Sequence, residues 1–271
     1  EGPVGLAARR WCLRHGRAYT SSYHTQFPEY VRLRAPIPLA AGYAYMRWFH
    51  GRAARTMVAT ASMEATLRAR GLHHLVRWSR GVDVDLFRPR DKGFLDVPRP
   101  VFMFVGRVAV EKNIEAFLAL DLPGTRYVVG DGPALADLRR RHPEVRFTGY
   151  KVGEDLARHV AAADVMVFPS RTDTFGLVLL EAMACGVPVA AYPAPGPLDL
   201  VTNGRNGWIG EDLREAALKA LECPPEACRE LAERYSWARC TEQFCANLAV
   251  PDPAPAPVLD AHADARPGES A

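Results

Sequence analysis

Short runs of apolar residues alternate with helical patterns along residues 100–192, and this alternation limits the possible folds more than any other feature of the chain. Runs such as VFMFV (101–105), YVV (127–129) and VMVF (165–168) are apolar at every position. Strands of this kind are buried on both faces, as in parallel sheets whose two sides are covered by helices. The segment therefore predicts a doubly wound α/β domain, in which ligands bind at the carboxyl ends of the strands.

The residues before this segment predict a second, smaller α/β unit. We expect strands within 17–24, 56–62 and 74–82, and helices within 7–15, 41–56 and 63–71. A polar stretch with several Pro and Gly residues predicts a linker. The expected divisions are an incomplete first domain at 1–85, the linker at 86–99, the second domain at 100–232, a helical segment at 233–249 and a disordered tail at 250–271.

Charge is distributed unevenly along the chain. Residues 1–99 hold 17 Lys and Arg against 7 Asp and Glu, a net of +10, and the remainder holds 17 against 24, a net of −7. A basic first part favours an anionic partner such as a lipid surface, and a bipolar protein without such a partner fits equally well. No apolar run reaches the roughly 18 residues of a membrane span. The six cysteines lack the spacing of a zinc site, which predicts reduced thiols, a cytoplasmic protein and no bound metal.

Three loops at predicted strand ends carry residues suited to phosphate. Arg107 and Lys112 follow the strand at 101–105, a Gly-Asp-Gly turn at 130–132 follows the next, and TDTFG (172–176) opens a helix. Arg can bind two phosphate oxygens and Lys acts as a point charge, while glycine lets the backbone approach a ligand closely. The N-terminus of a helix also favours an anion. Because the ends of parallel strands meet at one edge of a sheet, these loops predict a diphosphate site.

Two acids, Asp173 and Glu181, stand where a buried strand gives way to a buried helix. Burying a carboxylate is costly unless it has a partner. Either the two acids are paired within the protein, or they bind a group that the sequence does not contain. Beside a diphosphate site, both could accept hydrogen bonds from the hydroxyls of a ligand.

Taken together, the motifs resemble the donor-binding half of the retaining nucleotide-sugar glycosyltransferases of family 4, which have the GT-B fold. The resemblance is carried by GRVAVEKN (106–113), GDGP (130–133), FTGY (147–150) and FPSRTDTFGLVLLEAMACGVPVAA (168–191), and extends to YTSSYHTQFPEY (19–30) and GVDVDLFRP (81–89). The bacterial GDP-mannose-dependent mannosyltransferases and the sulfoquinovosyl-diacylglycerol synthases have similar motifs. The resemblance implies two Rossmann-like domains, the first incomplete, and transfer of a hexose, with mannose favoured, to a lipid or glycan acceptor. It also implies retention of configuration, no metal or other cofactor, and no nucleic-acid partner.

The resemblance assigns a role to each candidate residue. The family has glutamate at both acidic positions, and aspartate at position 173 is one methylene shorter, so its loop must come closer to the sugar. Glu181 would hold the ribose hydroxyls, Ser236 and Trp237 would begin a helix that crosses back to the first domain, and His24 would approach the sugar from that domain. The implied catalytic residues are His24, Arg107, Lys112 and Asp173. The implied donor-binding residues are Gly106, Gly130, Asp131, Gly132, Tyr150, Lys151, Thr174, Phe175, Gly176, Leu177 and Glu181.

The first domain is short for this family. Judged from normal domain sizes, roughly 90–120 residues are expected before it, so we expect the chain to bind nucleotide but to be poorly active alone. A UDP-sugar-dependent glycolipid synthase and a truncated nucleotide-binding module without activity are the alternatives. A dinucleotide-dependent oxidoreductase is disfavoured because VGRVAV lacks the GxGxxG pattern. The basic first part, with aromatic and arginine residues mixed at 43–56, favours a cytoplasmic protein at the inner face of the membrane.

Overall fold

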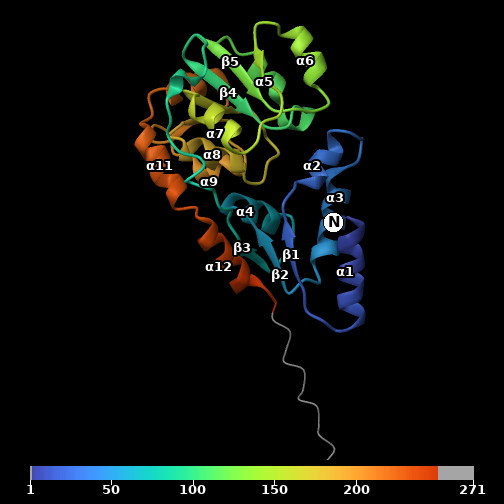
Figure 1. Ribbon diagram of the computed structural model, residues 1–271. Helices are drawn as coiled ribbons and strands as arrows, with labels where there is room; N and C mark the ends of the chain where they lie inside the picture. The colour runs from blue at the N-terminus through green and yellow to red at the C-terminus, as the bar shows by residue number, and fades with distance from the viewer. Residues whose placement is uncertain (1, 250–271) are drawn as a thin grey trace, which may run out of the picture.

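The computed structural model describes residues 2–249 and folds them into two parallel sheets, one in each part of the chain (Figure 1). The α/β class with two Rossmann-like units is thereby confirmed. The predicted tail at 250–271 lies outside the described residues. No helix within residues 2–249 is long and apolar enough to cross a membrane.

The second domain is built on a six-stranded parallel sheet with the order β6-β5-β4-β7-β8-β9. The chain starts at the centre with β4, adds strands on one side, and then returns to add β7 on the other side. The loops after β4 and β7 therefore flank a topological switch point, where doubly wound sheets bind ligands. The strands are β4 (Val101–Val105), β5 (Thr125–Val129), β6 (Arg146–Phe147), β7 (Val165–Phe168), β8 (Val189–Ala191) and β9 (Gly207–Ile209).

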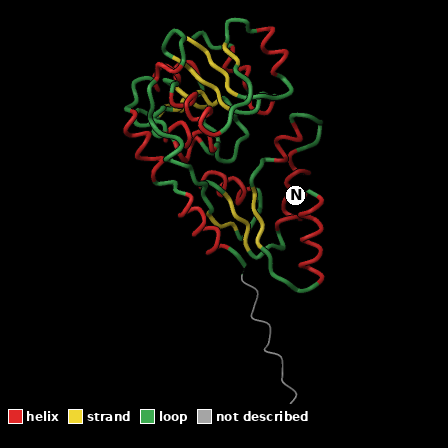
Figure 2. Tube along the Cα trace, viewed as in Figure 1, coloured by secondary structure: helices red, strands yellow, loops and turns green. Residues whose placement is uncertain are grey.

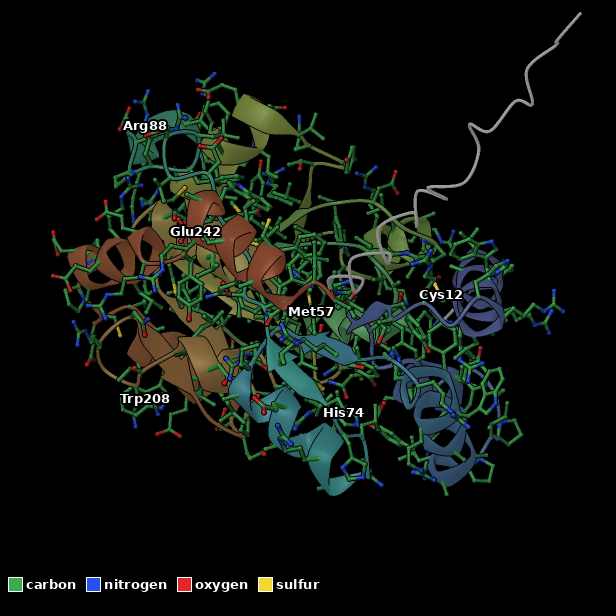
Figure 3. The ribbon with its side chains drawn as sticks, turned by 90° about the horizontal axis from the view of Figure 1, so that it is seen from below. Cys12, Met57, His74, Arg88, Trp208 and Glu242 are labelled. Atoms are coloured by element: carbon green, nitrogen blue, oxygen red, sulfur yellow. The ribbon has the colours of Figure 1, made fainter. Side chains whose placement is uncertain are left out.

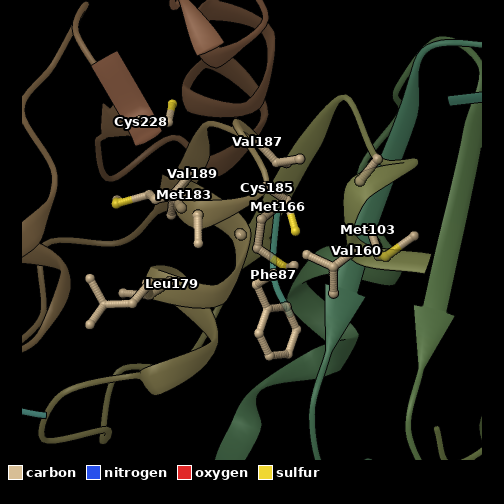
Figure 4. Close-up of a cluster of buried hydrophobic side chains, with 14 of the residues drawn as sticks. Phe87, Met103, Val160, Met166, Leu179, Met183, Cys185, Val187, Val189 and Cys228 are labelled. Carbon is tan, nitrogen blue, oxygen red and sulfur yellow. The ribbon is translucent and has the colours of Figure 1, made fainter. Parts of the chain in front are cut away.

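Helices cover both faces of this sheet, as the all-apolar strands require. Along β4, Val101 and Met103 face one hydrophobic cluster, whereas Phe102 and Phe104 face the other. Figure 4 shows part of the first cluster, where Met103 of β4 and Phe87 of the preceding segment gather with residues of the helices. The first cluster is completed by α7 (Gly153–Ala161), α8 (Leu177–Ala184) and α11 (Pro225–Glu233), and the second by α5 (Ile114–Leu118), α6 (Leu135–Arg141) and α10 (Leu213–Ala220).

The first domain is smaller, with a three-stranded parallel sheet in the order β1-β2-β3 (Figure 2). Its core is formed by aromatic and aliphatic side chains, among them the fully buried Tyr23, Tyr43 and Met63. The strands are β1 (Thr20–Tyr23), β2 (Arg55–Val58) and β3 (Leu75–Arg77), and the helices are α1 (Pro3–Arg14), α2 (Phe27–Arg32), α3 (Leu39–His50) and α4 (Ala61–Ala69).

The segment between the two sheets packs onto the second domain. The stretch expected as a polar linker contains the 3-10 turn η1 (Lys92–Phe94), and it buries Phe87 and Leu95 in the core of the second domain. The burial of these two apolar residues thus fixes the path of the segment between the two sheets. The chain passes from one domain to the other here for the first time.

The last described helix, α12 (Trp237–Asn247), returns to the first domain. Trp78 Nε1 donates a hydrogen bond to the carbonyl of Cys240 (3.1 Å), and the backbone N–H of Ser79 donates to Gln243 Oε1 (2.8 Å). Figure 3 shows Met57 of β2 between Glu242 on α12 and Cys12 on α1, and Figure 1 agrees that these helices flank the sheet. The chain therefore connects its two domains twice.

Three local predictions from the sequence were incomplete. The helix expected at 41–56 ends at His50, because Gly51 follows and β2 begins at Arg55. The six-residue α2 and the three-residue β9 were missed, since both are shorter than the patterns used to recognise helices and strands. A further short helix, α9 (Pro197–Leu200), was missed for the same reason.

Candidate functional site

A cavity of about 590 Å³ opens at the switch point of the second sheet. It collects the loops that follow β4, β5, β6 and β7, and apolar residues of the strand ends form part of its wall. Eleven of the fifteen residues singled out from the sequence line it: Gly106, Arg107, Lys112, Gly130, Asp131, Tyr150, Lys151, Asp173, Gly176, Leu177 and Glu181. Four do not line it: His24, Gly132, Thr174 and Phe175.

Hydrogen bonds between neighbouring loops fix the rim of the cavity. The N–H of Val108 donates to the carbonyl of Asp131 (2.9 Å), and the N–H of Gly130 donates to that of Gly149 (2.9 Å). Asn113, which has a left-handed φ of 51°, donates through Nδ2 to the carbonyl of Pro169 (3.1 Å). The loops after four strands are therefore one connected rim.

Glycine is required at position 130 by the neighbouring loop. Its φ is +145°, and a Cβ there would lie 1.9 Å from the carbonyl oxygen of Gly106. A Cβ at Gly132 would lie 2.3 Å from the carbonyl oxygen of Val108. The GDGP turn thus lets two strand-end loops approach each other, a reason for glycine beyond the expected approach to a ligand.

The two predicted cations both line the cavity, each beside an acid. Lys112 Nζ lies 2.5 Å from Asp173 Oδ1. Arg107 Nη1 lies 3.5 Å from Glu111 Oε1, and the Arg107 side chain is 61% exposed. Arg107 is thus held by a long contact and is accessible from the cavity.

The two predicted acids differ in their surroundings. Asp173 is paired with Lys112 through Oδ1, while its Oδ2 is buried and has no hydrogen-bond partner within residues 2–249. Glu181 lines the cavity, its carboxylate makes no hydrogen bond or ion pair in the described part of the chain, and burial raises the pKa of this carboxyl to about 7. The sequence left open whether the two acids are paired within the protein. Asp173 is paired through one of its two oxygens, whereas the Glu181 carboxylate is not paired with any residue that the structure describes.

The helix α8 begins beside these acids. Gly176 is its N-cap with a left-handed φ of +79°, and Leu177 is the first helical residue. The N–H groups in the first turn of a helix have no partner within the helix, and the helix dipole adds a partial positive charge there. With Arg107 and Lys112, this helix end makes one side of the cavity suited to an anion.

The loop after β6 forms another part of the cavity wall. Tyr150 is 73% exposed, and Lys151 Nζ is 2.8 Å from Asp155 Oδ2. Leu156 and Val178 lie on the cavity wall together with the buried Ser170. These three residues were not predicted from the sequence, because single apolar or serine residues in buried elements carry no distinctive pattern.

The exposed side chain of His24 is held by residues of the first domain. Its imidazole contacts Ser22 Oγ through Nε2 (2.6 Å) and the guanidinium of Arg80 through Nδ1, and packs edge-on against Trp78. Its carbonyl oxygen accepts a hydrogen bond from Thr174 Oγ1 (2.6 Å). The predicted residue thus touches the donor-side loop through its backbone, and the role of its side chain stays a prediction.

The first domain also reaches the cavity rim through α2 and the residues that flank it, contacts that the sequence reasoning missed. Gln26 Nε2 donates to the carbonyl of Asp173 (3.5 Å), and Arg34 Nη2 lies 2.7 Å from Glu111 Oε2. Burial and then the nearby Asp173 carboxylate raise the pKa of the Tyr30 phenol. Only Tyr30 lies within α2, so helical spacing in the sequence would not have brought the three residues together.

The second domain thus has a doubly wound sheet with cations and a helix N-terminus at the carboxyl ends of its strands, and a smaller α/β domain contacts its strand-end loops. Two family models match the chain, "Glycosyl transferases group 1" over residues 99–223 and "Glycosyltransferase Family 4" over residues 1–86. The chain belongs to the family 4 glycosyltransferases with the GT-B fold.

Similar proteins agree with this assignment. The chain is 36% identical to a GDP-mannose-dependent alpha-mannosyltransferase of Mycobacterium tuberculosis, over 77% of this chain and 57% of the relative. It is 32% identical to the sulfoquinovosyl transferase SQD2 of Arabidopsis thaliana, over 84% of this chain and 52% of the relative. The chain therefore spans about half the length of these relatives.

Solved structures support the fold. Sucrose-phosphate synthase from Thermosynechococcus elongatus superimposes with a TM-score of 0.74 at 24% identity, covering 89% of this chain and 70% of that one. Anabaena HepE in complex with UDP-glucose gives a TM-score of 0.73 at 19% identity, covering 89% of this chain and 75% of that one.

Proposed function

We propose that the chain binds a nucleotide-diphosphate sugar in the switch-point cavity and transfers the hexose, with mannose favoured, to a lipid or glycan acceptor. The observation that carries the proposal is the half-buried Glu181 carboxylate, which lines the same cavity as the cations and has no side-chain partner within residues 2–249. A ribose presents two neighbouring hydroxyls, which are the donors that such a carboxylate lacks. The similarity to GDP-mannose-dependent relatives favours mannose and guanine.

In the proposed reaction, the bond between the anomeric carbon and the diphosphate breaks while the acceptor oxygen bonds to that carbon, and the acceptor's proton passes to the leaving diphosphate. Negative charge grows on the leaving diphosphate, and Arg107, Lys112 and the N-terminus of α8 would stabilise it. The unpaired Oδ2 of Asp173 would accept a hydrogen bond from a sugar hydroxyl. We propose retention of configuration, as the family resemblance implies.

The charge neutralisation comes from side chains in this proposal, without a metal or another cofactor. Two cations line the cavity and a helix begins beside it, and we place the diphosphate there. We therefore expect that adding EDTA leaves the affinity for GDP unchanged. A large loss of affinity on chelation, restored by a divalent cation, would contradict this part of the proposal.

Titration calorimetry with GDP and UDP tests the donor site. We expect GDP to bind more tightly, and Arg107→Ala and Glu181→Ala each to weaken binding at least about tenfold, as loss of a hydrogen bond to a charged group does. Arg171→Ala is the matched control, because Arg171 pairs with Glu211 and does not line the cavity. Tighter UDP binding would favour a UDP-sugar-dependent glycolipid synthase, and binding of neither would refute the donor site.

A lipid acceptor and a peripheral contact with the inner membrane form the second part of the proposal. Exposed Trp48 and Trp11 stand on α3 and α1 among arginines, and Arg9, Arg47 and Arg52 line a groove there. Aromatic rings and cations on one surface suit an anionic lipid interface. Replacing Arg47, Arg52 and Arg55 together by Glu is expected to abolish sedimentation with vesicles containing anionic lipid, and unchanged sedimentation would contradict the membrane contact.

A further inference from the structure

A buried carboxylate lies at the meeting point of the two domains. Glu111 is 3% exposed, and its two oxygens face two different arginines. Arg34, just past the end of α2 in the first domain, lies 2.7 Å from Oε2. Arg107, on the donor-binding loop, lies 3.5 Å from Oε1. One acid thus has one close and one distant cation.

The close contact between Arg34 and Glu111 weakens the attraction of Glu111 for Arg107. A buried carboxylate is costly unless its charge is compensated. Arg34 supplies that compensation from the first domain, so Arg107 can remain 61% exposed beside the cavity. Without Arg34, the nearest cation left to Glu111 would be Arg107, and the attraction would draw its guanidinium away from the cavity.

We propose that Arg34 is a positioning residue for the donor site, which acts by occupying Glu111 and thereby leaving Arg107 free to bind the diphosphate. This inference rests on the proposed function, because it needs Arg107 to contact the phosphates. It gives the first domain a part in donor binding, since Arg34 can reach Glu111 only when the two domains are close. Donor binding and domain closure then favour each other, as coupled equilibria must.

Charge alone gives a rival explanation. Removing Arg34 lowers the local charge by one, which would weaken the binding of any anion without involving Arg107. The two explanations predict different results in a double-mutant cycle, because residues that act through each other have non-additive effects on affinity. If Arg34 acts through Arg107, its removal has no further effect once Arg107 is absent.

The test measures GDP affinity by calorimetry, or UDP affinity if the wild-type chain prefers UDP. We expect Arg34→Met to weaken binding about tenfold and Arg34→Lys to recover part of the loss. Adding Glu111→Gln to Arg34→Met is expected to restore the wild-type affinity, because Arg107 is then released. In the Arg107→Ala background, Arg34→Met is expected to change the affinity less than twofold.

Arg32→Met is the matched control. Arg32 is exposed in the last turn of α2, and its side chain makes no hydrogen bond or ion pair within residues 2–249. Guanosine, measured by ligand-observed NMR, lacks phosphate and is expected to bind equally to the wild type and Arg34→Met. A merely structural defect would also weaken the binding of guanosine, and adding Glu111→Gln would not correct that loss.

The outcomes separate the two proposals. Equal affinities for the wild type, Arg32→Met and Arg34→Met would overturn the role of Arg34 while leaving the donor site standing. A loss of the same size in the Arg107→Ala background would overturn it in favour of charge alone. A wild-type chain that binds neither GDP nor UDP would overturn both proposals.

Discussion

Replacing Glu181 by Gln is expected to stabilise the ligand-free protein and to weaken the binding of nucleotide. Gln has nearly the same shape but no charge, so the substitution removes the ionised form that burial disfavours. The folded-state pKa is about 7 against an ordinary 4.5. Between these two values the folded protein binds more protons than the unfolded chain, so its free energy of unfolding falls as pH rises.

The magnitude follows from the same shift. The full penalty is about 3 kcal/mol above pH 7, since each pKa unit is worth ~1.4 kcal/mol, and about 2 kcal/mol of it develops between pH 5.5 and pH 8. The difference in unfolding free energy between Glu181→Gln and the wild type should therefore grow by about 2 kcal/mol over that range. Above pH 8 it should be constant.

Urea denaturation followed by circular dichroism at pH 5.5, 6.5, 7.5 and 8.5 measures this difference. Asp199→Asn serves as a comparison, because it also removes one carboxylate but one that lies outside the cavity. A pH-independent difference between Glu181→Gln and the wild type would refute the reasoning. So would a Glu181→Gln variant that binds GDP as tightly as the wild type, since the charge would then serve no ligand.

Three further predictions concern other parts of the molecule. Gly130→Ala should cost more than about 3 kcal/mol of stability by thermal denaturation, because its Cβ would meet the Gly106 carbonyl, whereas Gly149→Ala, with a φ of +77° and no atom within 4 Å, should cost only about 1–2 kcal/mol. Asp199 accepts hydrogen bonds from the backbone N–H groups of Ala61 (2.9 Å) and Ser62 (3.1 Å) at the start of α4. Asp199→Ala should therefore lower the free energy of unfolding by about 1 kcal/mol and Tm by ~2–4 °C. An unchanged Tm would contradict the capping role. Burial raises the pKa of the Cys185 thiol to about 12, so a thiol reagent at pH 7.5 should label the exposed Cys245 well before Cys185, as peptide mapping would show.

The second sheet could be predicted from the sequence because its strands are buried on both faces and therefore apolar throughout. The same logic placed three loops at one sheet edge, and the structure brings eleven of the fifteen candidate residues to one cavity. What could not be predicted depends on contacts between distant segments. The pairing of Glu111 with Arg34 joins residues 77 positions apart, and the engagement of both His24 ring nitrogens comes from Ser22 and Arg80.

The two connections between the domains have a mechanical consequence. The segment after β3 and the return through α12 both cross the boundary, and two crossing points define an axis about which the first domain can turn. Helix α2 lies on the side of the first domain away from α12 (Figure 1). A small rotation at the crossings therefore moves α2 and the residues beside it through a larger arc than residues near the axis, so the contact between Arg34 and Glu111 is sensitive to such a rotation.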